Sequence, residues 1–261
     1  MSSSFQLKSH PKRYLVEHLS NVAETCRCLA PSKTYSAELN PTEIRETLRI
    51  IGASHDVGKA TKYFQEYIAS GKVTSPLLKS HSLLSSLYAY YATSQAGFKL
   101  SILPTYAQLT VVSHHGALQT PTLTATKLYD ARDLLRKQID MIQHVEELDT
   151  ALSKMHLPSF SDFMKEFGMH DDKLIMSPIN AIAQLSKENQ RLFSEPLLPI
   201  FTINLCLSTL VDSDRMDAAR LDFPRREMIR TQSVEEYVKD LSEYAKRSRK
   251  ADINIVKGLS L

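Results

Sequence analysis

The chain has 261 residues, of which 43% are hydrophobic and 23% are charged, and its formal net charge is +3. This hydrophobic content is enough for one large core or two small ones, and the mild positive charge permits an anionic partner without requiring one. Seven glycines and no tryptophan argue against an all-β sandwich, which needs many tight turns.

We expect a cytoplasmic protein that does not enter a membrane. An apolar stretch at residues 200–211 is too short to cross a bilayer and is interrupted by polar residues. The first ten residues lack a hydrophobic signal stretch, so export is not expected. Cys26 and Cys28 lie two apart on a predicted helix and point in different directions, so they indicate neither a disulfide nor a zinc site.

Apolar residues follow a helical period along most of the chain, which predicts an all-α fold. We expect a single helical domain over residues 1–261, with its core at about 13–219. The first helix shows the period most clearly, because its apolar positions alternate between spacings of four and three. His18 lies on the flank of this stripe. The stripe consists of Leu15, Leu19, Val22, Cys26 and Leu29.

A second predicted helix has a clear start. Asn40 is a good N-cap, Pro41 suits the first helical position, and Glu43 stands in the capping-box position. Its apolar face leads to His55, so a histidine stands where another core residue should lie. We expect Gly58 to end this helix. The apolar positions before the histidine are Ile44, Leu48 and Ile51.

Three shorter helices are predicted between residues 61 and 116. The middle one carries His81 in its first turn, and the last one ends at His114 and His115. We expect them at about residues 61–69, 80–93 and 104–116.

The second half of the chain is less regular. Residues 122–152 predict one long charged helix, whereas residues 156–199 contain several prolines and predict no clear element. An apolar stripe at helical spacing then leads to Asp214. The stripe consists of Ile203, Leu207 and Leu210.

A basic helix is predicted at the carboxyl end, over residues 233–251. A solvated helix face and a nucleic-acid contact both fit its basic cluster. This cluster consists of Lys246, Arg247, Arg249 and Lys250.

Several histidines and aspartates interrupt these apolar faces. Burying a polar side chain without a partner costs roughly 1–3 kcal/mol, so several such residues call for a shared explanation. A metal site supplies one, because imidazole nitrogens and carboxylate oxygens facing inward can bind a cation. Each residue taken alone could instead be a helix cap or an exposed side chain. The residues are His18, His55, Asp56, His81, His114, His115 and either Asp212 or Asp214.

The sequence His55-Asp56-Val57-Gly58-Lys59 resembles the H-D-x-G-K core of the HD superfamily of metal-dependent phosphohydrolases. That superfamily pattern also has an earlier histidine, matched by His18, and a late aspartate. Asp212 and Asp214 are two apart on a helix and cannot face one site equally. The apolar stripe continues to Asp214, so we favour Asp214.

The remaining histidines point to one family within this superfamily. Ser80-His81-Ser82 and His114-His115-Gly116 are similar to segments of the CRISPR-associated HD nucleases of type I systems. The stretch from Gly58 to Gln65 is also similar to that family. This implies a single HD-domain helical bundle. The sequence has no Walker A motif, so it looks like the stand-alone form rather than the form fused to a helicase.

The resemblance implies two divalent metal ions. His18, His55, Asp56 and Asp214 would hold the first, and Asp56 would bridge to a second held by His81, His114 and His115. Lys59 would lie beside the scissile phosphate as a point charge. A ligand set rich in histidine favours Mn, Fe, Co or Ni over Mg.

By the same resemblance, the activity would be hydrolysis of phosphodiester bonds in single-stranded DNA. The partners would be a separate helicase subunit and an RNA-guided surveillance complex. Two alternatives stay open at this point. One is a phosphohydrolase acting on nucleotides or cyclic dinucleotides, and the other is an HD-like binding module without catalysis.

Overall fold

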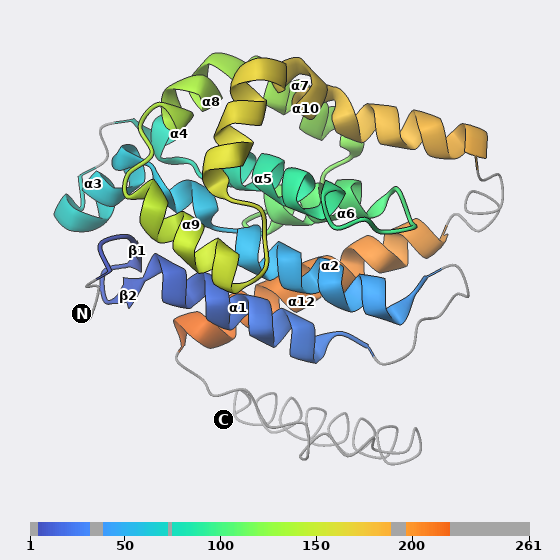
Figure 1. Ribbon diagram of the computed structural model, residues 1–261, viewed down its shortest axis with the longest axis horizontal. Coiled ribbons are helices and arrows are strands. Elements are labelled where there is room, and N and C mark those ends of the chain that lie inside the picture. Colours follow the sequence, from blue (N-terminus) through green and yellow to red (C-terminus); the bar gives the residue numbers. More distant parts are fainter. Residues whose placement is uncertain (1–4, 32–38, 73–74, 189–196, 220–261) are drawn as a thin grey trace, which may run out of the picture. The chain divides into compact units, whose positions relative to one another are not determined.

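The computed structural model describes residues 5–31, 39–72, 75–188 and 197–219 (Figure 1). The prediction of an all-α fold is confirmed, and a short antiparallel hairpin of β1 (Lys8–His10) and β2 (Arg13–Tyr14) precedes the helices. The predicted helix at 233–251 lies outside the described residues, so a single domain over 1–261 stays a prediction. The described helices are α1 (Leu15–Leu29), α2 (Pro41–Ser54), the 3-10 helix η1 (Val57–Ala60), α3 (Lys62–Ser70), α4 (Pro76–Lys79), α5 (Ser82–Ser94), α6 (Leu103–Ser113), α7 (Pro121–Asp130), α8 (Arg132–Ile139), α9 (Val145–Lys154), α10 (Phe160–Glu188) and α12 (Leu197–Ala218).

The start of α2 follows from its local sequence. The side chain of Asn40 accepts a hydrogen bond from the backbone N–H of Thr42 at 2.9 Å, and Pro41 opens the helix as predicted. The carboxylate of Glu43 accepts a hydrogen bond from the backbone N–H of Lys99 at 3.1 Å. Glu43 therefore ties α2 to the segment before α6, a tertiary contact that the sequence did not indicate.

Gly58 has a different role from the predicted one. Helix α2 ends at Ser54, and Gly58 lies within η1. A Cβ atom at Gly58 would lie 2.6 Å from the carbonyl oxygen of His81, and the Gly58 N–H donates to Oγ of Ser85 at 3.0 Å. The glycine therefore allows η1 to approach the start of α5 closely, which brings Asp56 next to His81.

The single helix predicted at 122–152 is wrong, since the chain forms three helices there. Between α8 and α9 the backbone instead pairs with the segment before α3. Lys62 N–H donates to the carbonyl of Met141 at 2.7 Å, and Gln143 N–H donates to the carbonyl of Ala60 at 2.9 Å. His144 then takes a left-handed conformation (φ 48°) before α9. These long-range hydrogen bonds override the local helical preference.

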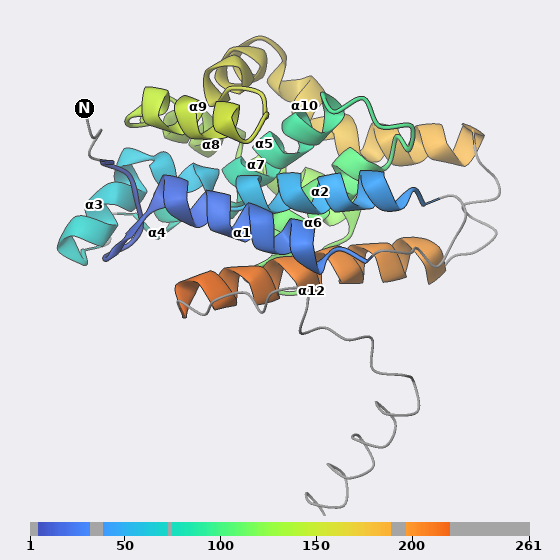
Figure 2. The same cartoon turned by 60° about the horizontal axis from the view of Figure 1, so that its bottom comes forward.

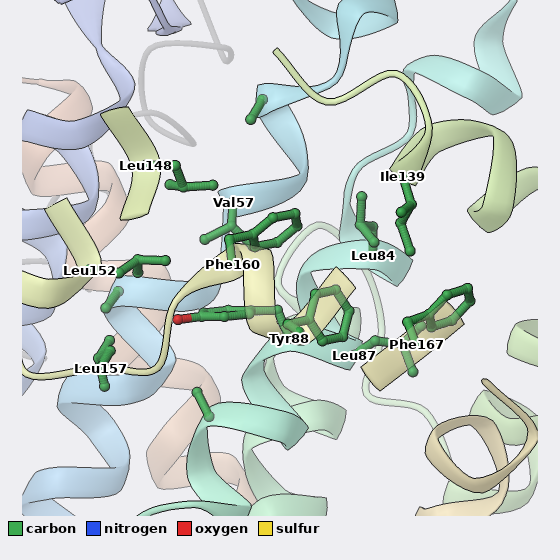
Figure 3. Packing of buried hydrophobic residues seen from close by; sticks show 14 of the residues in the cluster. Val57, Leu84, Leu87, Tyr88, Ile139, Leu148, Leu152, Leu157, Phe160 and Phe167 are labelled. Carbon is green, nitrogen blue, oxygen red and sulfur yellow. The ribbon is translucent and has the colours of Figure 1, made fainter. Parts of the chain in front are cut away.

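Helix α10 occupies much of the stretch for which no element was predicted, and it is kinked at His170. Its buried face carries phenylalanines at helical spacing, and two of them pack against Tyr88 of α5 (Figure 3). The ring centroids of Tyr88 and Phe160 lie 5.3 Å apart, and those of Tyr88 and Phe163 lie 5.6 Å apart. The Tyr88 hydroxyl donates to the carbonyl of Pro158 at 2.6 Å. The buried stripe consists of Phe160, Phe163 and Phe167.

Helices α1, α2 and α12 lie side by side (Figure 2), and α6 packs against α2, α5 and α12. Every residue of α6 is buried, which makes it the central helix of the bundle. This packing brings the C-terminal half of α12 next to α1 and directs the ends of α2 and α6 toward the same region. Within the described residues, no helix combines the length and apolarity needed to span a bilayer.

Candidate metal centre

Polar side chains on or next to six helical segments meet in one region. His18 lies on the buried face of α1, and Asp214 lies on α12. The others stand at helix boundaries. His55 caps the end of α2, Asp56 precedes η1, His81 precedes α5, and His114 and His115 follow α6.

Four of these residues form what we call the His18 cluster: His18, His55, Asp56 and Asp214. One ligand atom from each lies within 4.8 Å of all the others. Nε2 of His18 is 3.1 Å from Nε2 of His55 and 3.1 Å from Oδ2 of Asp56. Oδ1 of Asp214 lies 3.4 Å from Nε2 of His18 and 3.6 Å from Nε2 of His55.

The His81 cluster consists of Asp56, His81, His114 and His115, and its ligand atoms also lie within 4.8 Å of one another. Nε2 of His81 is 3.0 Å from Oδ1 of Asp56 and 3.1 Å from Nε2 of His115. Nε2 of His114 is 3.7 Å from the same Asp56 oxygen. Asp56 is therefore common to both clusters, with Oδ2 directed to the His18 cluster and Oδ1 to the His81 cluster.

Hydrogen bonds on the far side of three imidazoles fix which nitrogen faces the clusters. Nδ1 of His55 donates to the carbonyl of Gly52 at 2.8 Å, and Nδ1 of His114 donates to the carbonyl of Val111 at 2.5 Å. Nδ1 of His18 lies 2.7 Å from a carboxylate oxygen of Asp217. Because these partners accept hydrogen bonds, each Nδ1 carries a proton, and each ring turns its Nε2 into the clusters.

This arrangement of lone pairs fits bound cations. Without a proton or a cation between them, Nε2 of His18 and Nε2 of His55 would set two lone pairs against each other. Oδ1 of Asp56 and Nε2 of His114 are buried and form no hydrogen bond, although His81 lies close to that oxygen. A buried acceptor without a donor is costly, and a cation would satisfy it.

Electrostatics keep the two carboxylates ionised and one imidazole protonated in the metal-free protein. Burial opposes ionisation of Asp56, but His55 and Lys59 outweigh it and hold its pKa well below the usual range. For Asp214, burial is likewise outweighed by His55, and the pKa falls to about 2. Burial also disfavours the charged form of His18, yet hydrogen bonds to Asp217 and Asp56 raise its pKa to about 9.

Comparison with known proteins identifies the family of this chain. The chain matches the family described as Cas3, HD domain, over residues 6–177. The chain belongs to this family. The CRISPR-associated Cas3 HD domain protein MJ0384 from Methanocaldococcus jannaschii has a similar structure, with a TM-score of 0.50 and 19% identity over 80% of this chain and 100% of that one. No curated protein sequence matches the chain.

The segment matched to the Cas3 HD family contains six of the seven cluster residues, and Asp214 lies beyond it. The structure favours Asp214 over Asp212, because Asp214 reaches both histidines of the His18 cluster while Asp212 is exposed. The phase of α12 differs from the predicted stripe, since Ile203 and Leu207 are only partly buried. The fully inward face of α12 carries Thr202, Cys206, Leu210, Ser213 and Asp217.

Lys59 is buried, with 5% of its surface exposed. Its Nζ lies 2.6 Å from Oδ2 of Asp56, and it is 5.2 Å from the ring centroid of Phe64. Lys59 is therefore not an ordinary surface lysine. The other predicted nucleic-acid contacts, Lys246, Arg247, Arg249 and Lys250, lie outside the described residues.

Sequence reasoning missed two residues next to the clusters. His10 of β1 has its ring centroid 5.5 Å from that of His18, and burial lowers its pKa. Asp217 hydrogen-bonds to His18 from α12. Asp217 follows Asp214 by three residues and so lies on a neighbouring part of the same helix face, which is the signal that could have revealed it. His10 had no comparable signal.

Proposed function

We propose that this protein is a divalent-metal-dependent nuclease that hydrolyses phosphodiester bonds of single-stranded DNA in type I CRISPR interference. The observation that carries the proposal is the division of Asp56 between two imidazole-rich clusters. A carboxylate with one oxygen directed to each cluster suits a bridge between two cations. His18, His55, Asp56 and Asp214 would hold one cation, and Asp56, His81, His114 and His115 would hold the other.

Two such cations would lower the pKa of a bound water and stabilise charge on the attacking and leaving oxygens of a phosphodiester. The chain's own residues hold the geometry. Backbone carbonyls of Gly52 and Val111 fix His55 and His114, and Gly58 keeps η1 close enough to α5 for Asp56 to reach His81. Five imidazoles against two carboxylates favour Mn, Fe, Co or Ni over Mg.

Lys59 supplies positive charge beside the bridge. Its Nζ is close enough to Asp56 that it would also lie near a phosphate bound at the two clusters. We propose that it contacts the scissile phosphate as a point charge. The basic residues Lys246, Arg247, Arg249 and Lys250 would contribute further contacts to the DNA or to a partner.

Membership of the Cas3 HD family supports a CRISPR setting in the cytoplasm. The partners would be an RNA-guided surveillance complex and a separate helicase subunit, as in CRISPR systems whose HD nuclease is a stand-alone protein. The outer edge of the clusters is open, because His115 is exposed and 24% of the Asp214 side chain is exposed. An open edge suits a strand that passes along the site.

A substrate comparison tests this function. Purified protein loaded with Mn²⁺, Co²⁺, Ni²⁺ or Mg²⁺ is given single-stranded DNA, duplex DNA, RNA, nucleoside mono- and triphosphates, and a cyclic dinucleotide. We expect cleavage of single-stranded DNA, with duplex largely intact and weaker DNA binding at higher salt. Hydrolysis of a free nucleotide or cyclic dinucleotide without cleavage of single-stranded DNA would show the other kind of phosphohydrolase. No turnover of any substrate with any metal would favour a binding module.

A further inference from the structure

Behind the His18 cluster, a second buried carboxylate contacts His18 from the side opposite the cluster. Oδ2 of Asp217 lies 2.7 Å from Nδ1 of His18, while Nε2 of the same ring faces His55 and Asp56. Asp217 lies on α12, is 9% exposed, and falls outside the segment matched to the Cas3 HD family. It is not a member of either cluster of possible ligands.

Asp217 is itself held in place. Nη2 of Arg13 and Nδ2 of Asn21 donate to its Oδ1, the latter at 2.9 Å, and Nε of Arg13 donates to Oδ2 at 3.2 Å. Both oxygens are therefore occupied by donors from β2 and α1. This carboxylate cannot turn toward the clusters without breaking these bonds, so its geometry suits positioning rather than ligation.

The position of His18 in its helix explains why it needs such a partner. His55 and His114 follow the ends of α2 and α6, where carbonyls lack helical N–H partners, so each ring uses a carbonyl three residues earlier. His18 lies in the first turn of α1, where the unpaired backbone groups are N–H donors. An acceptor for its Nδ1 must therefore come from another element, and α12 provides it.

The two clusters differ in how many of their histidines have a hydrogen-bond acceptor at Nδ1. Both histidines of the His18 cluster have an acceptor at Nδ1, and both are fully buried. In the His81 cluster only His114 has one; within the described residues, neither His81 nor His115 donates a hydrogen bond from Nδ1 to a protein acceptor. His115 is also exposed.

We propose that Asp217 is a positioning residue that fixes the ring of His18 and thereby makes the His18 cluster the tighter of the two metal sites. The inference rests on the metal centre of the proposed function, but not on its substrate. Partners that orient a metal-binding histidine are commonly worth roughly 10–100-fold in metal affinity.

The test is a Co²⁺ titration of metal-free protein, followed by calorimetry and visible absorption. We expect two unequal sites in the wild type. Asp217→Ala should weaken the tighter site by roughly 10–100-fold and leave the weaker one nearly unchanged. The Co²⁺ affinity of the tighter site in Asp217→Asn should lie between those of the wild type and Asp217→Ala, because the amide oxygen still accepts from Nδ1 but carries no charge.

Asp171 supplies a matched control for stability. It is another buried aspartate, 7% exposed, and it is paired with Arg132 and Arg136 on α8. Asp171→Asn should lower the melting temperature without changing either Co²⁺ affinity. If Asp217→Ala does not fold, Asp217→Asn provides the same comparison.

Combining Asp217→Asn with a second substitution that disables one cluster shows which metal site Asp217 affects. In His115→Ala, which removes a ligand of the His81 cluster, Asp217→Asn should still weaken the remaining tight site. In His55→Ala, which disables the His18 cluster, Asp217→Asn should have little effect on the remaining site. Unchanged Co²⁺ affinities in Asp217→Asn, or equal losses at both sites, would overturn the inference. A wild-type protein that binds no Co²⁺ would instead contradict the metal centre itself.

Discussion

His18 and His55 point their Nε2 atoms at each other across 3.1 Å, while Nδ1 of each ring is already engaged by an acceptor. Hydrogen bonds to Asp217 and Asp56 raise the pKa of His18 to about 9, so in the absence of metal we expect a proton on this ring to relieve the opposition. A divalent cation would replace the proton. Metal binding and protonation of His18 should therefore compete.

This competition predicts a pH dependence of stability. The pKa of His18 is about 9 in the folded metal-free protein, against an ordinary value of 6.5. Because this pKa is higher in the folded than in the unfolded state, protonation of His18 stabilises the fold. The contribution, up to about 3 kcal/mol, is fully present below pH 6.5 and is lost as the pH rises through 9. His55 and His81 have lowered pKa values and stay neutral over this window. Thermal melts of metal-free protein should show a falling melting temperature between pH 6.5 and 9.5.

Metal affinity should change in the opposite direction over the same window. The His18 cluster should bind Co²⁺ about tenfold more tightly per pH unit up to pH 9, because one proton leaves for each metal bound. His18→Gln is the control, since it removes the titrating group and should flatten the apoprotein melting curve. A wild-type melting temperature that does not change with pH would show that His18 is not protonated.

Chelation should abolish activity. We expect EDTA-treated protein to regain cleavage of single-stranded DNA best with Mn²⁺, Co²⁺ or Ni²⁺ and poorly with Mg²⁺, because imidazoles dominate both clusters. The measurement is the initial cleavage rate at equal metal concentrations. Full activity after exhaustive metal removal would rule out a metal mechanism.

Asp214→Ala should impair metal binding and activity far more than Asp212→Ala. Asp214 reaches His18 and His55, whereas Asp212 is exposed on the same helix and serves as a matched control. We expect the loss of Asp214 to lower the metal affinity of the His18 cluster at least about tenfold. Losing a residue that only orients a ligand already costs about that much, and Asp214 would be a ligand itself. The reverse ranking would place Asp212 in the cluster.

Gly58→Ala should disturb the approach of η1 to α5. The new Cβ would lie 2.6 Å from the carbonyl of His81, and overpacking of this kind costs roughly 1–3 kcal/mol. Gly116→Ala is the control, because nothing lies within 4 Å of a Cβ there. We expect Gly58→Ala to lower both the melting temperature and the occupancy of the His81 cluster. Equal melting temperatures for the two variants would contradict the close approach.

Local signals in the sequence predicted much of the fold and most of the clusters. Asn40 and Pro41 define a helix start by chemistry within one turn, and His55–Asp56 stands at the end of an apolar stripe. The break between α8 and α9 coincides with backbone bonds to Ala60 and Lys62, which no local pattern encodes. Asp217 was missed for a similar reason, since its role depends on packing of α12 against α1. Lys59 was predicted beside the site, but its burial against Asp56 depends on tertiary packing.

Metal counting on purified Asp56→Ala and His115→Ala, alongside cleavage of single-stranded DNA, tests most directly whether Asp56 joins two metal sites in one catalytic centre. We predict that Asp56→Ala loses turnover and both tightly bound metals, while His115→Ala loses mainly the metal of the His81 cluster. An Asp56→Ala protein that retains two tightly bound metals would contradict the shared bridge.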